Sequence, residues 1–268
     1  MADGGKYVLW GRPSSLNVQK ALVALEACGI SDFEFVHASA LLAPGSNEYA
    51  AVDAGVAAVN TDAYRRLNPN PSVPTLQLAS AGGGALWESN TIVRYLARKH
   101  RPALIGGGSL EAAAAMEKWM DWELQHPKLY PPLKKLHDNV VRLPASDRDA
   151  GVIVGSAAAF FGALAIVEAQ LEETPFLGGD SFSVADIGLG AFVSRCKVSL
   201  LRAREDHGDK LDVTGVPRTP AIDAWYERLL REPAFVAGCD VPERLHASLP
   251  VSGELPAWYK AYNAKYNL

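Results

Sequence analysis

Two adjacent serines, Ser14 and Ser15, lie where a short apolar segment gives way to a helical pattern. Gly11 and Pro13 mark a turn just before them. A helix that begins here leaves unpaired main-chain N–H groups and the positive end of its dipole beside the two hydroxyls. Neither serine is followed three residues later by Glu or Gln, so the partner residue of a capping box is missing. A hydroxyl in this place can instead donate a hydrogen bond to an anionic sulfur or oxygen.

A valine–proline pair, Val73 and Pro74, opens a second segment of interest. Proline cannot donate a hydrogen bond to a strand ladder, so Pro74 indicates an edge strand or a special turn. A cis bond between the two residues would leave the main chain of Val73 open to pair with another extended peptide. Spacing alone leaves a second interpretation open, in which Pro74 simply begins a strand.

A third motif, Glu88-Ser89-Asn90, stands where a strand is expected to run into a helix. The N–H groups at the start of such a helix favour an anion, and the hydroxyl of Ser89 adds a donor. The simpler alternative, which this string favours on its own, is that Ser89 only caps its helix.

The spacing of apolar residues predicts the elements that carry these motifs. Strands are expected at 7–10 and 33–38, with a helix between them in which apolar residues recur at i, i+3, i+4 and i+7 from Val18. A strand–helix–strand unit of this kind has parallel strands. A hairpin over 72–88 and a helix over 89–100 follow. The Ala-rich connection 39–61 is too long for a simple loop, so part of it is expected to be helical.

Beyond a boundary at 101–108, the chain is helical in character. Ser183 and Asp186 have the spacing of a capping box at the start of one of these helices. The expected helices lie at 110–125, 146–173, 184–201 and 220–231.

Composition excludes several functional classes. The chain has 268 residues, a net charge of -4 and 49% hydrophobic residues, which predicts a globular protein without a nucleic-acid or anionic-membrane surface. Its three cysteines form no CxxC pair, and its histidines have no metal-ligand spacing, so neither a dithiol site nor a metal site is expected. The start of the sequence has no signal-peptide pattern, and no apolar run reaches the ~20 residues of a membrane span. A cytoplasmic protein is therefore the expectation.

Four motifs in this order resemble those of the cytosolic glutathione transferases. They are "SSLNVQKALVALEACGI", "LNPNPSVPTLQL", "LWESNTIVRYLA" and "SFSVADI", and the likeness covers most of the chain. The resemblance is to serine-type members, whether theta-, phi- or zeta-like or a bacterial or algal relative. It implies an α/β plus all-α fold, with a thioredoxin-like glutathione-binding domain at 1–100, a linker at 101–108, and an all-helical domain at 109–268 that holds the electrophile pocket. It also implies a homodimer.

The resemblance further implies where glutathione binds. Val73, ahead of a cis-Pro74, would pair with the cysteinyl main chain of glutathione, and Glu88 and Ser89 would hold its γ-glutamyl end. Ser72 stands where a longer polar side chain is common. The glycyl end is left unassigned, with His37, Arg65 and Arg66 as candidates. The full set of expected glutathione contacts is Ser14, Asn17, Ser72, Val73, Pro74, Glu88 and Ser89.

Ser15 is the expected thiol-activating residue. Counting back from the Gly-Ile pair that ends the first helix places the serine-type position on Ser15, and Asn17 then falls where plant-type members have S-x-N. Ser14 is the runner-up, and Tyr7 stands four residues too early for a tyrosine-type member. On this interpretation Ser15 donates a hydrogen bond to the thiolate and is not a nucleophile. Glutathione is a co-substrate, and no cofactor is expected.

The expected reaction is the conjugation of glutathione to hydrophobic electrophiles, as in detoxification. The electrophile pocket is expected to draw on Arg12, Pro13, Met116, Trp119 and Met120. Glutathione-dependent peroxidase or dehalogenase chemistry at the same site is not separated by sequence. A non-catalytic module of the same fold that binds glutathione or a hydrophobic ligand is the alternative.

Overall fold

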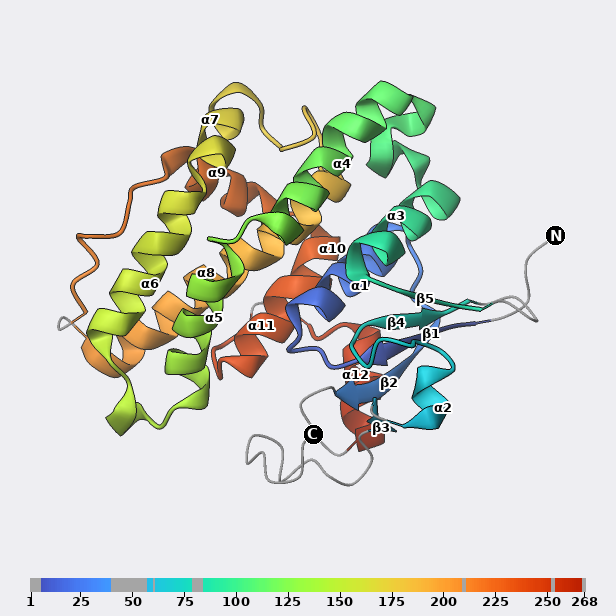
Figure 1. The fold of residues 1–268 in the computed structure, drawn as a ribbon, viewed down its shortest axis with the longest axis horizontal. Helices are drawn as coiled ribbons and strands as arrows, with labels where there is room; N and C mark the ends of the chain where they lie inside the picture. Colours follow the sequence, from blue (N-terminus) through green and yellow to red (C-terminus); the bar gives the residue numbers. More distant parts are fainter. Residues whose placement is uncertain are drawn as a thin grey trace.

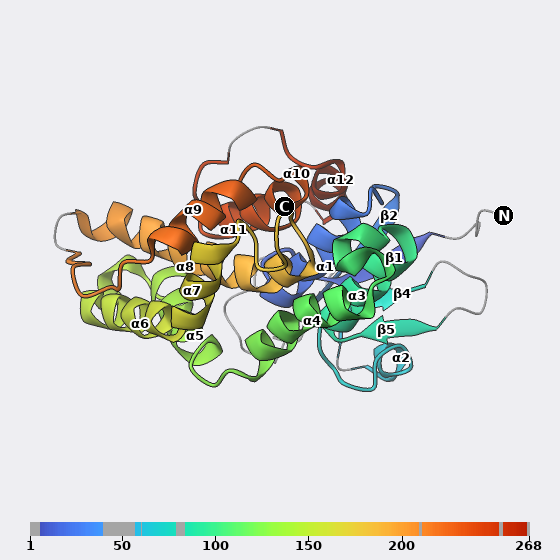
Figure 2. The ribbon, with the colours of Figure 1, turned by 90° about the horizontal axis from the view of Figure 1, so that it is seen from above.

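A computed structural model describes residues 6–39, 57–59, 61–78, 84–208, 211–251 and 254–266. A mixed five-stranded sheet lies at one end of the molecule and a group of helices at the other (Figures 1 and 2). This arrangement confirms the predicted fold class, a small α/β domain followed by an all-helical one. Most of the connection 39–61 lies outside the described residues, so the prediction of a helix there is not tested.

The sheet has the strand order β3-β2-β1-β4-β5. β1 and β2 are parallel, as the strand–helix–strand pattern predicts, and β4 and β5 pair antiparallel as a hairpin. The strands are β1 (Tyr7–Gly11), β2 (Phe33–Ser39), β3 (Ala57–Ala58), β4 (Thr75–Gln77) and β5 (Ala85–Trp87).

Helices α1 and α3 pack on one face of this sheet, between it and the helical half of the molecule (Figure 1). α1 is almost wholly buried because elements of both halves pack around it. The short α2 lies on the other face, where Tyr64 packs edge-on against Trp10. The helices of this part are α1 (Leu16–Ala27), α2 (Asp62–Arg65) and α3 (Ser89–His100).

The rest of the chain is helical after a 3₁₀ segment, η2 (Pro102–Gly108). Two longer helices, α4 and α8, cross in close contact because Gly188 of α8 leaves room for the buried carboxylate of Glu123. The elements are α4 (Leu110–Gln125), α5 (Tyr130–His137), the π-helical turn η3 (Asp138–Arg142), the 3₁₀ turn η4 (Ala145–Asp147), α6 (Ala150–Ala163), α7 (Ala165–Glu173), α8 (Val184–His207) and α9 (Pro220–Leu229). No single helix in the described ranges has the length and apolar character to cross a membrane, although the bent pair α6 and α7 passes that test on length and composition.

The helix bounds differ most from the sequence expectations in α6–α7 and in α8. The helix expected at 146–173 is two helices that meet at Leu164 with a bend of 52°. α8 continues six residues past its expected end at Leu201, to His207. The capping box at the start of α8 is confirmed, since Ser183 and Asp186 bond each other's main chain reciprocally. Asp186 also accepts hydrogen bonds from Leu177 N and Trp225 Nε1, each 2.9 Å long.

The last thirty-odd residues return to the first domain. The second π-helical turn, η6, which contains Gly238, packs closely on α1. A side chain at Gly238 would collide with the main chain of Val23. Trp258 and Tyr262 of the final helix pack on the aromatic side chains of β2. The elements are α10 (Pro233–Phe235), the turn η6 (Val236–Asp240), α11 (Val241–His246) and α12 (Ala257–Tyr266).

Candidate functional site

A cavity of about 390 Å³ opens between the two halves of the molecule. The start of α1 forms one wall, with Ser15, Leu16 and Asn17. The opposite walls come from α4, α5, η3 and α8 of the helical half. The first residues of α1 therefore face residues of the helical half that lie more than a hundred positions later in the sequence.

Ser15 stands at the open end of α1. It is the N-cap residue, with an extended main chain (φ -86°, ψ 123°), yet its hydroxyl accepts no capping hydrogen bond. Its N–H donates to the carbonyl of Arg12 at 3.0 Å, which closes the turn ahead of the helix. The hydroxyl of Ser15 lies beside the positive end of the helix dipole, where it can donate to an anion.

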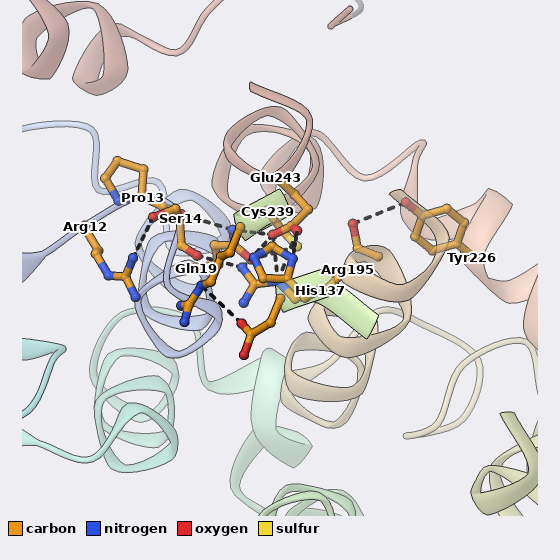
Figure 3. A network of polar contacts seen from close by, with 12 residues as sticks. Arg12, Pro13, Ser14, Gln19, His137, Arg195, Tyr226, Cys239 and Glu243 are labelled. Carbon is orange, nitrogen blue, oxygen red and sulfur yellow. Dashed lines mark hydrogen bonds and ion pairs between the residues drawn. The ribbon is translucent and has the colours of Figure 1, made fainter. Parts of the chain in front are cut away.

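Two side chains hold the carbonyls of this turn (Figure 3). Gln19 Nε2 donates to the carbonyl of Pro13 at 3.0 Å, and Arg195 Nη2 donates to the carbonyl of Ser14 at 2.6 Å. Arg195 belongs to α8, so a helix of the second domain fixes the main chain next to Ser15. The hydroxyl of Ser14 has a different neighbour, since it accepts a hydrogen bond from Arg12 Nη1 at 3.3 Å.

The carboxylate of Glu243 anchors both of these side chains. Glu243 is wholly buried on α11. Its Oε2 accepts from Gln19 Nε2 at 3.0 Å and from Arg195 Nη2 at 2.8 Å, while Oε1 accepts from Arg195 Nε at 3.0 Å. Burial opposes ionisation, but the Arg195 guanidinium outweighs it and lowers the pKa of Glu243. The sequence offered no local signal for this network, because its members are spread from Pro13 to Glu243.

The Val73–Pro74 peptide bond is cis. β4 begins only at Thr75, so the main chain of Val73 lies ahead of the strand ladder. The carbonyl of Ser72, just before it, accepts hydrogen bonds from Tyr64 Oη at 2.7 Å and Asn68 Nδ2 at 3.2 Å. α2 and the loop after it thus position the residue expected to meet the main chain of a peptide ligand.

The start of α3 brings Ser89 toward Asn17 of α1. Ser89 is buried, and its hydroxyl donates to Asn17 Oδ1 at 3.4 Å. It is the first residue of α3 and not the cap, since Glu88 occupies the N-cap position. Glu88 has φ 68° and ψ 114°, a conformation that costs a non-glycine residue roughly 1–3 kcal/mol and is concentrated at functional sites.

Only some of the residues expected to contact an electrophile line the cavity. Arg12 lines the cavity, and Pro13 lies in the turn behind it. Trp119 and Met120 are buried in the core, and Met116 packs near Gly178; none of the three lines the cavity. α4 faces the cavity one turn later, through Glu123 and Leu124.

Most residues of the cavity wall opposite the start of α1 were not predicted from the sequence. Tyr130, Leu133 and His137 recur at i, i+3 and i+7 on α5, and Phe192 joins them from α8. The prolines at 131 and 132 concealed this helix, although proline fits the first turn of a helix without cost.

A buried ion pair forms the floor between the domains. Lys20 of α1 and Glu123 of α4 are 0% and 1% exposed and are bonded to each other, and the Lys20 ammonium lies 5.2 Å from the Phe192 ring centre. Burial raises the pKa of Glu123, and Lys20 opposes that rise. Removing one partner of such a pair typically costs about 3–5 kcal/mol, because the other charge stays buried.

The candidates for the glycyl end of glutathione do not line the cavity. His37 is buried in β2, with its ring 5.3 Å from that of Tyr262, and burial lowers its pKa to about 4. Arg65 and Arg66 lie at the end of α2, where Arg65 is within 4.0 Å of Asp62. Tyr7 lies elsewhere, bonded to His100 at 2.8 Å, and burial raises its pKa to about 12.

Two histidines are stacked at the cavity wall, where His137 lines the cavity and His246 does not. The rings of His137 and His246 are 5.2 Å apart and tilted by 28°. Burial lowers the pKa of His246 to about 4, although Glu243 opposes the fall, and burial with the charge of Arg195 lowers the pKa of His137 well below its usual value. Both rings are therefore neutral at pH 7.

We expect this pair to make the folded state less stable in mild acid. Between pH 6.5 and pH 4 the unfolded chain binds protons at these rings that the folded chain does not, so the free energy of unfolding falls as pH falls through this window. The expected contribution of His246 is about 1–3 kcal/mol between pH 7 and pH 4.5. Urea unfolding at pH 7, 5.5 and 4.5 measures it. His246→Gln should flatten the dependence; equal slopes in the two proteins would contradict the prediction.

Comparison with known proteins connects this geometry to one family. Residues 14–99 match the family model for the glutathione S-transferase N-terminal domain, and residues 144–228 match the model for the C-terminal domain. The chain is 31% identical to glutathione S-transferase GstB of Escherichia coli over 84% of its own length and 94% of the relative's. It is 28% identical to glutathione S-transferase 4 of Zea mays over 84% of its length and 88% of the relative's. A theta class glutathione S-transferase from Xanthomonas axonopodis pv. citri, solved with glutathione bound, superposes with a TM-score of 0.66 at 32% identity, over 87% of this chain and 97% of that one.

Proposed function

Because the chain belongs to the glutathione S-transferase family, we propose that it joins the thiol of glutathione to electrophilic small molecules. The observation that carries this proposal is the position of Ser15, a hydroxyl with no capping bond at the N-terminus of α1, on the wall of a cavity shared by both domains. In this assignment 1–100 is the glutathione domain, and 109–268 supplies the electrophile side.

Glutathione is proposed to bind along the edge of the first domain. The main chain of Val73, ahead of β4, pairs with the cysteinyl residue of glutathione. Ser72 and Pro74, on either side of Val73, set the conformation of this segment. Glu88 and Ser89 hold the γ-glutamyl end at the start of α3, and the contact between Ser89 and Asn17 supports this assignment. Ser14 contributes through the turn that carries Ser15.

The proposed chemistry is stabilisation of a thiolate. A free thiol with a pKa of about 8.5 is only a few per cent ionised at neutral pH. Lowering that pKa by about two units requires roughly 2.7 kcal/mol, which a charge-assisted hydrogen bond from Ser15 and the α1 dipole can supply together. The thiolate then attacks the electrophilic carbon, a C–S bond forms, and the leaving group departs with its electron pair.

We expect glutathione-dependent turnover of at least one electrophile in a panel of aryl halides, benzyl halides, enones, hydroperoxides and α-halo ketones. Loss of the electrophile, formation of the thioether and formation of glutathione disulfide are measured together, which separates conjugation from peroxidase and dehalogenase chemistry. Retention on immobilised glutathione without turnover of any class would instead show a binding module. No retention and no turnover would contradict the proposed site itself.

The same proposal extends to assembly and place of action. A homodimer that acts in the cytoplasm is expected, and membership of the family supports both. Sedimentation velocity at low micromolar concentration checks the assembly, and a single species at the mass of one 28.7 kDa chain would contradict it.

A further inference from the structure

A second cavity, of about 510 Å³, lies at the far end of α1 from Ser15. It opens where the end of α1, the turn formed by α10 and η6, and the start of α12 meet. Ser15 and Glu26 are 11 positions apart on α1, which is roughly 16 Å along the helix axis. Among the described residues the two cavities share none of their lining, so a ligand here does not occupy the site proposed for conjugation.

Apolar side chains form most of this second cavity. They belong to the part of the chain that returns to α1 after α9. The main ones are Leu230, Pro233, Val236, Val241, Pro256 and Trp258. An apolar cavity of this size accepts a small molecule with an aromatic or branched hydrocarbon body, and the few polar groups in its wall decide which one.

One carboxylate stands among these apolar groups. Glu26, the next-to-last residue of α1, is half-buried and lines the cavity. Burial raises the pKa of Glu26, and no charged side chain of the described residues acts on it. A cation in the cavity would favour the ionised carboxylate, because an opposite charge nearby offsets the cost of burial.

The indole of Trp258 lies beside this carboxylate. Trp258 is 5% exposed, and its Nε1 has no hydrogen-bond partner of normal geometry among the described residues. After the effect of burial, the indole N–H is near enough to Glu26 to oppose the rise of the carboxyl pKa. An ionised carboxylate is a stronger acceptor for this N–H than a protonated one. A cation that keeps Glu26 ionised therefore satisfies both groups.

The other charged residues of the second cavity lie at its rim. Arg231 is exposed and is not among the groups that act on the pKa of Glu26, which burial raises. The side chain of Glu254 is 92% exposed and is bonded to Lys260 at 3.2 Å. Water and salt screen charges in such positions, so they select a ligand weakly. Within the described lining, Glu26 is the charged group that the apolar side chains surround.

We propose that the second cavity binds an amphipathic organic cation, a protonated amine with an aromatic or branched apolar body. The ammonium group donates to the Glu26 carboxylate, and the apolar body lies against Trp258 and the side chains after α9. A charge-assisted hydrogen bond at a half-buried carboxylate gives the amine an advantage that a neutral molecule of the same shape lacks. The site is separate from the proposed conjugation and involves no chemical step.

Three ligands with the same naphthalene body test the charge selection. 2-(1-Naphthyl)ethylamine is a cation at neutral pH, 2-(1-naphthyl)ethanol is neutral, and 1-naphthylacetate is an anion. Calorimetry with the full chain is expected to show the amine binding about tenfold more tightly than the alcohol, and the acetate binding most weakly. Equal affinity of the amine and the alcohol would show an apolar cavity without charge selection. Tightest binding of the acetate would assign the selection to Arg231, and either result overturns the proposal.

Substitutions locate the bound amine. Glu26→Gln keeps the shape of the side chain and removes its charge, so the affinity for the amine should fall about tenfold, to that for the alcohol. Ala257→Leu adds bulk at an exposed residue that lines the cavity, so both ligands should bind severalfold more weakly. Glu172→Gln is the matched control, because Glu172 is an exposed carboxylate of α7 that does not line the cavity. It should bind the amine as the unmodified protein does.

A competition measurement separates this site from the cavity beside Ser15. Saturating S-benzylglutathione should leave the affinity for the amine unchanged, because the described linings of the two cavities have no residue in common. Displacement of the amine by S-benzylglutathione, or full affinity for the amine in Glu26→Gln, overturns the proposal. None of these measurements requires turnover, so the amine site stands or fails whether or not the protein conjugates glutathione.

Discussion

Replacing Ser15 with alanine is expected to lower kcat/KM for conjugation by about 10²–10³ at neutral pH, the loss typical of removing one donor to a developing or bound anion. The hydroxyl of Ser15 makes no capping bond that would be lost, so α1 should keep its stability. The pKa of bound glutathione is expected to rise by about one to two units. Ultraviolet absorbance of the bound thiolate, titrated against pH, measures that rise directly.

Two further variants make the result specific to this hydroxyl. Ser15→Thr keeps a hydroxyl at the N-cap and should recover much of the rate. In Ser14→Ala the main-chain carbonyl that Arg195 holds is retained, and only the contact with Arg12 is lost. Its loss of rate is expected to be smaller, within about fivefold, a factor worth ~1 kcal/mol. A larger loss in Ser14→Ala than in Ser15→Ala would transfer the activating role to Ser14.

Replacing Glu243 with alanine is the second substitution with a large expected effect. It leaves Arg195 buried without its carboxylate and removes one of the partners of Gln19, so the free energy of unfolding should fall by about 3–5 kcal/mol. Urea unfolding measures the loss, and Glu227→Ala, an exposed change on α9, is the control.

The double variant Glu243→Ala/Arg195→Met separates stability from positioning. Without the guanidinium no charge is buried alone, and part of the lost stability should return. The carbonyl of Ser14 still has no donor, so the thiol pKa in the complex should stay raised and kcat low. Recovery of both stability and kcat would show that the network supports the fold and does not position Ser15.

The elements around the site could largely be predicted because they depend on local patterns. Short β-prone segments next to Gly and Pro predicted β1, β2 and the β4–β5 hairpin, and apolar residues at helical spacing predicted α1, all close to their observed bounds. The bend at Leu164 was not predicted, because only Gly162 precedes it, no proline does, and apolar residues continue on both sides.

The polar interior could not be predicted, because its partners are distant in sequence. Lys20 and Glu123 have the residue types of a solvated helix face, yet each is buried against the other. Glu243 meets Gln19 only because the end of the chain folds back onto α1. Local spacing carries no information about such contacts, so the sequence pointed to Ser15 without showing what holds its turn in place.

The return of the chain end to α1 has a consequence for the order in which the protein is made. Gln19 and its partner Glu243 are 224 positions apart. At 5–20 residues per second, a ribosome needs roughly 11–45 s to bridge that distance. The turn that presents Ser15 is therefore translated well before the carboxylate that holds it in place. The nascent chain carries an unfinished site throughout that interval and can complete it only after Glu243 has been added.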